Sequence, residues 1–230
     1  MEIIRSFKTI KWANCKIQFD YVCYVVKQDG SHYTGKWRDV DSRPQAVSDL
    51  SDVQELHKTL REDQYYHQVK ICEFLQDLPH PNVGVYHGCY ERGGYITSIT
   101  SGRYMMTFAL RVNPRSLSKE DFRASEREKV DEIMTNGLSG VLAGIRHLHE
   151  NGLAHNNINP RAIMLAGDSS LVIVDFRCSG RLGEPLPNCE RAPHWHDPKV
   201  EVSRKENDLD AYEELRTWLV GSAEDQFRFE

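Results

Sequence analysis

The sequence predicts an α+β chain with a strand-rich first part and a mainly helical second part. Aromatic and β-branched residues alternate from Ile17 to Trp37 around an Asp-Gly pair, which is typical of a β-hairpin. Apolar residues recur at steps of three and four between Val130 and Leu148, which predicts the strongest helix of the chain. Farther on, a polar loop that begins at His155 is followed by the apolar run Val172–Val174, which ends on Asp175.

The size and composition of the chain are those of an ordinary globular protein. Its 230 residues are enough for one large domain or two small lobes with a substantial core. The composition, 40% hydrophobic and 27% charged, argues against wholesale disorder. The formal net charge of -5 gives no electrostatic reason to bind nucleic acid or an anionic membrane. We therefore expect a protein as the partner.

The cysteines and the amino terminus bear on the cellular location of the protein. None of the six cysteines forms a C-x-x-C pair, so neither a zinc ribbon nor a thioredoxin-type site is indicated, and we expect reduced thiols. Charges in the segment Met1–Lys8 interrupt the apolar core that a secretory signal would need. No run reaches the roughly 18 apolar residues of a membrane span. These features predict a cytosolic or nuclear protein.

The rest of the first part alternates helical and strand signals. Ser51–Gln54 has the pattern of a capping box and predicts a helix with Val53, Leu56 and Leu60 on one face. A second helical stretch is predicted over Gln68–Leu75. Two strand-like runs follow, at residues 83–88 and 95–100, separated by a Gly-containing turn.

The second part begins with a connecting segment at Ser101–Tyr104 and contains a charged linker over Pro114–Ser125. The long predicted helix carries Gly137, Gly140 and Gly144. Each costs about 1 kcal/mol relative to alanine, which favours a close approach to another helix. A final helix is predicted over residues 206–220, with Gly221 ending it.

The loop after the long helix resembles the His-Arg-Asp-Leu-x-x-x-x-Asn catalytic loop of eukaryotic protein kinases, and Asp175-Phe176 resembles the start of their Asp-Phe-Gly motif. His155 matches that loop. Asn156 stands in place of the arginine, Asn157 in place of the catalytic aspartate, and Ala162 in place of the metal-binding asparagine. His80-Pro81-Asn82 and Asp208 also match kinase motifs in order and spacing, and the chain looks most like the divergent small kinase-like proteins of filamentous fungi.

The resemblance implies a bilobal protein-kinase-like fold. Residues 1–104 would form a small β-rich N-lobe with an αC-like helix. Residues 105–230 would form a truncated, mainly helical C-lobe that ends near the αF helix, and together the two lobes would make one kinase-like domain. The chain ends before the αG to αI helices of a kinase, so much of the usual substrate-docking surface is expected to be missing.

The resemblance also assigns the candidate site residues, most of them altered. Asn157 and Asn159 occupy catalytic positions, but an amide cannot act as a carboxylate base. Lys36 is either a solvated lysine at a sheet edge or the lysine that holds the nucleotide phosphates. Asp175 is either the ligand of a Mg²⁺ ion or an acid that caps the next turn.

Two further features weaken the expected nucleotide site. The segment Trp12–Asp20 lacks the glycines of a phosphate-binding loop. Gln68 replaces the αC glutamate, and Glu73 is one turn away. ATP and Mg²⁺ binding is therefore expected to be weak or absent. The leading hypothesis is a pseudokinase with a regulatory or interaction role, and the alternative is an atypical, weakly active Ser/Thr protein kinase that binds ATP.

Overall fold

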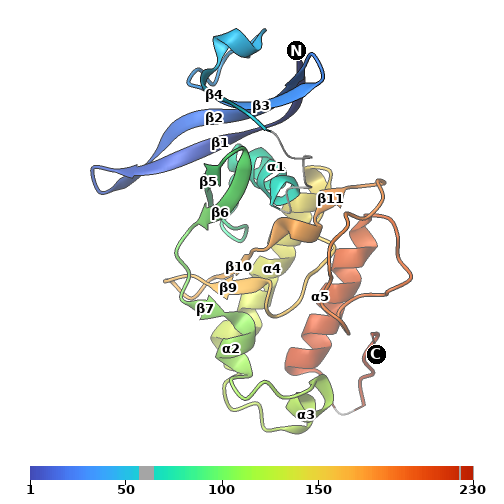
Figure 1. The fold of residues 1–230 in the computed structure, drawn as a ribbon. Coiled ribbons are helices and arrows are strands. Elements are labelled where there is room, and N and C mark those ends of the chain that lie inside the picture. Colours follow the sequence, from blue (N-terminus) through green and yellow to red (C-terminus); the bar gives the residue numbers. More distant parts are fainter. Residues whose placement is uncertain (57–64, 223, 230) are drawn as a thin grey trace. The chain divides into compact units, whose positions relative to one another are not determined.

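The computed structural model describes residues 1–56, 65–222 and 224–229, and the chain divides into two compact units. The first unit comprises Met1–Asp77 and Val85–Gly102, and the second comprises Leu78–Gly84 and Arg103–Glu230. Strands dominate the first unit and helices the second, so the predicted α+β class is confirmed (Figure 1).

The first unit is built on a six-stranded sheet in the order β4-β3-β2-β1-β5-β6. Neighbouring strands are antiparallel except β1 and β5, which are parallel. The elements of this unit are β1 (Glu2–Ala13), β2 (Lys16–Gln28), β3 (Ser31–Trp37), the 3-10 turn η1 (Val47–Asp49), β4 (Ser51–Glu55), the helix α1 (Tyr66–Gln76), β5 (Tyr86–Arg92) and β6 (Tyr95–Ser101).

The predicted hairpin is confirmed as β2 and β3. Gln28 pairs with Ser31, and the two residues between them, Asp29 and Gly30, have φ angles of 51° and 83°. Positive φ at both central positions is the backbone of the tight turn that matches strand twist, and it explains the Asp-Gly pair. Val22, Tyr24 and Val26, which alternate along β2, pack with Leu50 in a small core.

The glycine-free segment before this hairpin is a second tight turn. β1 and β2 are joined by Asn14 and Cys15, whose φ angles are 53° and 58°. The long strand β1 was not among the sequence predictions. It pairs with β2 from Glu2 to Ala13, so this region forms a regular two-stranded ribbon.

The helix predicted to start at Ser51–Gln54 is wrong, because these residues form the edge strand β4. They pair with β3, with Thr34 opposite Gln54 and Lys36 opposite Ser51. The apolar residue Val53 is exposed, so the spacing of apolar residues in this segment does not mark a buried helix face. Leu60, the third residue of that predicted face, lies outside the described residues.

The remaining helix of the first unit is confirmed, and two strands follow it, although the first begins at Tyr86 and extends to Arg92 instead of spanning residues 83–88. The stretch predicted as helical over Gln68–Leu75 lies within α1, which packs on β1 and β5 and buries Val69, Cys72 and Leu75. The two later strand-like runs correspond to β5 and β6, joined by a turn at Gly93 and Gly94 with positive φ at both residues.

The second unit holds four helices and two small sheets among its described residues, and helices α4 and α5 lie side by side (Figure 1). The sheets have the strand orders β10-β9-β7 and β11-β8. The elements are β7 (Met106–Thr107), α2 (Phe108–Val112), α3 (Lys119–Ala124), α4 (Glu132–Glu150), β8 (Leu153–Ala154), β9 (Ile163–Leu165), β10 (Leu171–Ile173), the 3-10 turn η2 (Phe176–Cys178), β11 (Gly180–Arg181) and α5 (Lys205–Val220).

The long predicted helix is confirmed as α4. The Asp131 carboxylate caps its first turn by accepting from the Met134 N-H at 2.9 Å. Its glycines do permit a close approach, but not to a helix as expected. A Cβ on Gly140 would lie 2.5 Å from the Asn82 side chain, and one on Gly144 would lie 2.9 Å from the Asn82 carbonyl oxygen. The glycines therefore accommodate the His-Pro-Asn turn.

The charged linker predicted over Pro114–Ser125 is partly wrong, because it contains the short helix α3. The Ser118 hydroxyl accepts from the Asp121 N-H at 3.1 Å and so caps this helix, which the charged composition concealed. α3 buries Phe122 against Trp218 of α5, with ring centroids 4.3 Å apart. Trp218 is therefore part of the core.

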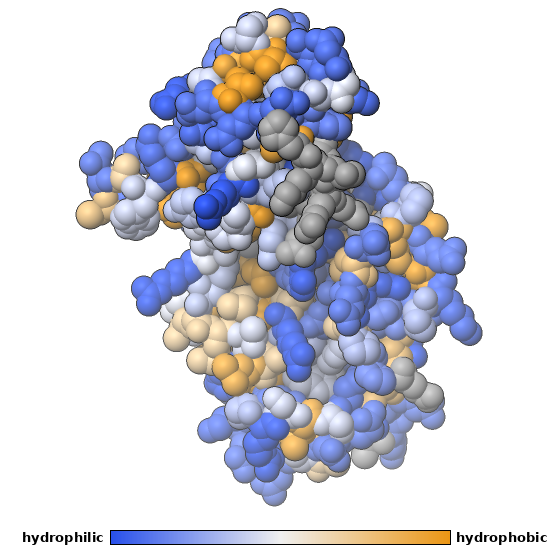
Figure 2. All heavy atoms as spheres, viewed as in Figure 1, coloured by the Kyte–Doolittle hydropathy of each residue, from blue (hydrophilic) through white to orange (hydrophobic). Residues whose placement is uncertain are grey.

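Hydrophilic residues dominate the face shown in Figure 2, where hydrophobic residues form small separate patches. Among the described residues, no helix combines the length and the apolar character that crossing a membrane requires.

Candidate functional site

The loop between β8 and β9 is fixed by one buried carboxylate. Asp208, at the start of α5, is fully buried and accepts from the backbone N-H groups of His155 and Asn156 at 2.8 and 2.7 Å. His149 Nε2, at the end of α4, lies 2.9 Å from the same carboxylate and acts as a third donor. Because a buried charge requires such partners, Asp208 ties two helices to the first residues of the loop.

Asn156 holds a strained turn in this loop. Its φ angle is 62°, a left-handed conformation that asparagine tolerates better than most residues. Its side-chain amide donates to the Cys178 carbonyl and the Ser203 hydroxyl, both at 3.0 Å, and its side-chain oxygen accepts from Asn207 at 2.9 Å. A residue that replaces the kinase arginine therefore connects three segments of the second unit.

His155 is fully buried and its two ring nitrogens have separate roles. Nδ1 accepts from the Asn157 N-H at 3.3 Å, which assigns the proton to Nε2. Nε2 then donates to the Val174 carbonyl oxygen at 2.9 Å. The ring also meets Phe176 edge-on at 5.5 Å. His155 thus joins the loop to the residue that follows β10 and to the turn η2.

Asn157 and Asn159, the predicted catalytic positions, lie close together and are buried. The side-chain oxygen of Asn157 accepts from the Ala192 N-H at 2.8 Å. The Asn159 amide donates to the Asn157 carbonyl at 2.8 Å, and its oxygen accepts from the Arg161 N-H at 2.9 Å. The Asn157 side chain thus binds the backbone of residue 192, and the Asn159 side chain binds the backbone of the loop itself.

Asp175 has a left-handed backbone, with φ of 66°, and its carboxylate faces Arg177. The guanidinium donates to both oxygens, from Nε at 2.7 Å and from Nη2 at 2.8 Å. Burial raises the pKa of Asp175, but the hydrogen bonds and charge of Arg177 outweigh it and hold the pKa below its usual value. Arg177 therefore neutralises the Asp175 carboxylate.

The candidate site offers a magnesium ion a single carboxylate, Asp175, and this carboxylate is already paired with Arg177. Mg²⁺ favours oxygen ligands, and Ala162 offers none while both oxygens of Asp175 accept from Arg177. Within residues 1–56, 65–222 and 224–229, no group of three His, Cys, Asp or Glu side chains could hold a metal.

The expectation of reduced thiols is wrong for one pair, because Cys178 and Cys189 form a disulfide. Sequence spacing could not identify this pair, since the two residues are 11 positions apart without a C-x-x-C pattern. The bond closes the segment that follows Asp175 into a loop. In the described part of the chain, Cys15, Cys23, Cys72 and Cys89 take part in no disulfide.

Lys36 belongs to the first unit and pairs with β4. Its ammonium lies 2.8 Å from the Asp52 carboxylate and 4.8 Å from the centre of the Tyr21 ring. The hydrogen bond to Asp52 raises the pKa of Lys36. In the described part of the chain neither Gln68 nor Glu73 pairs with Lys36. Glu73 instead accepts from the Lys8 N-H at 2.7 Å and so ties α1 to β1.

Comparison with known proteins adds an independent line of evidence. No protein family model matches the chain. The serine/threonine-protein kinase TAO1-A of Xenopus laevis is 27% identical over 154 residues, 66% of this chain and 14% of that protein. TAO3 of Mus musculus is 26% identical over 156 residues, and TAO2 of Rattus norvegicus is 25% identical over 154 residues.

These matches support a protein kinase-like superfamily. The aligned regions cover only 16% and 11% of TAO3 and TAO2, so the chain spans a small part of these relatives. The finer likeness to fungal kinase-like proteins stays a prediction.

Sequence reasoning singled out His155 and Asn157, and it placed Asp208 at the tie between the last helix and the loop, but it missed the contacts of Asn156 and the bond from Ala192. The partners of Asn156, and the bond from Ala192 to Asn157, join residues 22 to 51 positions apart. Only the identity of the residue at position 156 gave a local signal, because asparagine favours a left-handed turn.

Proposed function

We propose that this chain is a protein-kinase-like protein without effective catalysis, a pseudokinase that acts as a regulatory or interaction module. In this proposal the first unit corresponds to an N-lobe with α1 as the αC-like helix. The second unit corresponds to a C-lobe in which α4 and α5 take the αE-like and αF-like places. The partner would be a protein, in keeping with the net charge of -5, which favours neither nucleic acid nor an anionic membrane.

The hydrogen bond from Ala192 to Asn157 carries the proposal. A kinase needs a carboxylate at this position to orient the acceptor hydroxyl and take its proton. Asn157 is a neutral amide, it is buried, and its oxygen is engaged by the backbone of residue 192 at 2.8 Å. The pairing of Asp175 with Arg177 supports the same proposal, because the carboxylate that would hold Mg²⁺ in phosphoryl transfer is occupied by the guanidinium.

A phosphotransfer assay tests this proposal. Wild-type protein and the Asp175→Ala variant are incubated with radiolabelled ATP and either Mg²⁺ or Mn²⁺, with and without a generic protein substrate. We expect no transfer that depends on Asp175. Asp168→Ala is the matched control, because it removes an exposed carboxylate from the nearby turn between β9 and β10. Transfer that survives in Asp168→Ala but is abolished in Asp175→Ala would refute the pseudokinase proposal.

A weakly active, atypical protein kinase is the second candidate, and the similarity to serine/threonine-protein kinases favours it. In that case Lys36 and Asp175 would take part in binding ATP, and Asn157 would only position the acceptor. Asp175 would first have to release Arg177. A thermal shift with millimolar Mg-ATP that is lost in Asp175→Ala would indicate nucleotide binding, which the transfer assay then separates from catalysis.

A further inference from the structure

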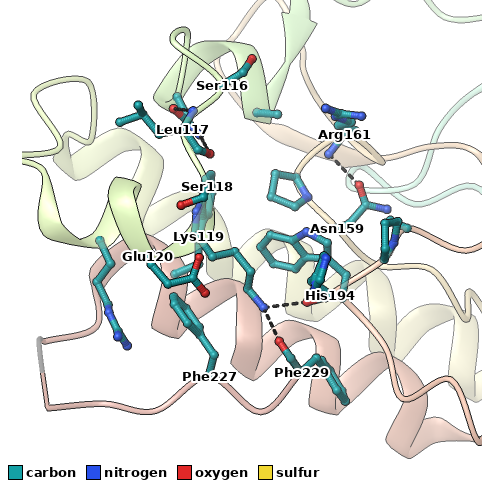
Figure 3. Close-up of a pocket in the computed structure, with 18 of the residues that line it drawn as sticks. Ser116, Leu117, Ser118, Lys119, Glu120, Asn159, Arg161, His194, Phe227 and Phe229 are labelled. Atoms are coloured by element: carbon teal, nitrogen blue, oxygen red, sulfur yellow. Dashed lines mark hydrogen bonds between the residues drawn. The ribbon is translucent and has the colours of Figure 1, made fainter.

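A groove on the second unit lies beside the candidate site. It has a volume of about 1140 Å³ and runs from the loop after β8, at Asn159 and Arg161, past residues 192–195 to α3. Figure 3 shows that residues 116–120 line one side and that Phe227 and Phe229 lie along another. These two phenylalanines belong to the segment 224–229, which we call the tail segment, so part of the groove wall is itself an extended peptide.

The groove holds the tail segment chiefly by its main chain. The buried Glu214 carboxylate accepts from the N-H groups of Arg228 at 2.7 Å and Phe229 at 3.4 Å. Lys119, which is ion-paired with Glu214, donates to the Phe229 carbonyl at 3.0 Å. Any extended peptide offers the same N-H and carbonyl groups, so these contacts do not require the tail's own sequence.

Two side chains of the tail segment add specificity, because the Arg228 guanidinium pairs with Asp210 and the Phe227 ring lies between two cations. The Phe227 ring lies 4.6 Å from the Lys119 ammonium and 4.3 Å from the Arg123 guanidinium, both within range of a cation-π interaction. Arg123 also donates to the Asp225 carbonyl. The groove therefore recognises an aromatic ring placed between two cations, next to a short stretch of backbone.

The charges around the groove select an acidic ligand. Its walls outside the tail segment carry Lys119, Arg123 and Arg161 against Glu120, and Glu214 beneath them is ion-paired with Lys119, so a single positive charge is in excess. The tail segment places two acids, Glu224 and Asp225, before its aromatic residue. The positive walls and the acidic start of the segment are complementary, which favours association through charge.

The tail segment is only lightly buried. Residues 224, 225, 226 and 228 are exposed, and only the two phenylalanines are half-buried. Few buried apolar contacts allow a segment to open without unfolding the unit beneath it. By contrast Trp218, which forms the floor of the groove, is buried in the core.

We propose that this groove docks an extended peptide of a partner protein, with acidic residues followed by an aromatic residue, and that the tail segment is its intramolecular competitor. The inference rests on the proposed interaction role and gives that role a surface and a ligand chemistry. The partner peptide would take the main-chain bonds of Glu214 and Lys119 and place its ring between Lys119 and Arg123.

A peptide-binding experiment on the full chain tests this inference. The probe is a fluorescein-labelled peptide with the sequence of residues 222–229, followed by fluorescence polarisation. The tethered tail segment competes with the probe at an effective concentration of about 1 mM. For a free peptide that binds the open groove with a dissociation constant of roughly 0.1 mM, this competition raises the apparent dissociation constant about tenfold. Phe227→Ala, which removes the ring held by the two cations, should therefore bind the probe about tenfold more tightly than wild type.

A second variant opens the tail by another route. Arg228→Pro removes both the N-H that donates to Glu214 and the side chain that pairs with Asp210, so it should also strengthen probe binding. Gln226→Ala is the matched control, because its exposed side chain should leave binding unchanged. The double variant Arg123→Ala/Phe227→Ala should bind the probe at least threefold more weakly than Phe227→Ala alone. A probe with alanine in place of its first phenylalanine should not bind. Thermal melts verify that every variant is folded.

Two results would overturn the inference. One is equal probe binding by wild type, Phe227→Ala and Arg228→Pro. The other is a wild-type dimer, seen by light scattering, that Phe227→Ala converts to monomer, because that assigns the groove to a second copy of the chain. Neither result bears on phosphotransfer, so a failure here is distinguishable from a failure of the pseudokinase proposal.

Discussion

Replacing Asp208 by alanine tests whether this buried carboxylate organises the candidate site. The substitution leaves three buried donors without an acceptor: the N-H groups of His155 and Asn156, and His149 Nε2. A buried unsatisfied donor costs about 1–3 kcal/mol, so the free energy of unfolding should fall by roughly 3–9 kcal/mol. Because domains are stable by only about 5–15 kcal/mol, the variant should be strongly destabilised or unfolded.

The assay is urea unfolding of wild type, Asp208→Ala and Asp208→Asn, followed by tryptophan fluorescence. Asparagine keeps the shape and one acceptor oxygen, so its loss should be smaller than that of alanine. Glu213→Ala is the control in the same helix. It breaks an exposed pair with Arg216, which is worth at most about 0.5 kcal/mol. A loss below about 1 kcal/mol for Asp208→Ala would refute the view that Asp208 is the anchor of the loop.

Three further predictions concern the surroundings of the site. Asp175→Asn should cost up to about 1 kcal/mol at neutral pH, since Arg177 is largely exposed. Because folding lowers the pKa of Asp175, the Asp175–Arg177 pair stabilises the protein above pH 3.8, the usual pKa of an aspartate, and this stabilisation is lost as the pH falls through the folded-state pKa. The unfolding curves of wild type and Asp175→Asn in urea should therefore converge in acid. Reducing the Cys178–Cys189 bond should destabilise the second unit by about 2–3 kcal/mol, measured by thermal melts with and without reductant, and a double serine variant should not respond to reductant. Gly144→Ala should lower stability by about 1–3 kcal/mol despite the better helix propensity of alanine, because the added Cβ would lie 2.9 Å from a backbone oxygen. Chemical unfolding measures this change, and a stabilised variant would contradict it.

Elements with a strong local signal were predictable from the sequence. Helix α4 follows from its apolar period, and the β2–β3 turn follows from Asp29-Gly30, because both depend on residues a few positions apart. The strand β4 was mistaken for a helix because Ser51–Gln54 fits a local cap equally well. Its pairing with β3, which decided the outcome, involves residues 15 or more positions away.

The contacts of the candidate site were beyond local reasoning for the same reason. The loop from His155 to Ala162 could be located by its pattern, but the acceptor of the Ala192 N-H is 35 positions away and the partner of Asn156 in α5 is 51 positions away. The disulfide likewise depends on how the chain returns to Cys178, which residue spacing does not determine.

The amides at positions 156 and 159 offer a chemical reason for the composition of this loop. A carboxylate only accepts hydrogen bonds, and a guanidinium only donates them, whereas an asparagine side chain does both. Asn156 donates to Cys178 and Ser203 while it accepts from Asn207, and Asn159 donates to one backbone group while it accepts from another. A side chain that only donates or only accepts could not satisfy both directions at once. The two amides therefore supply bonds that hold the loop in place, which fits the proposed role of this loop as part of a binding surface.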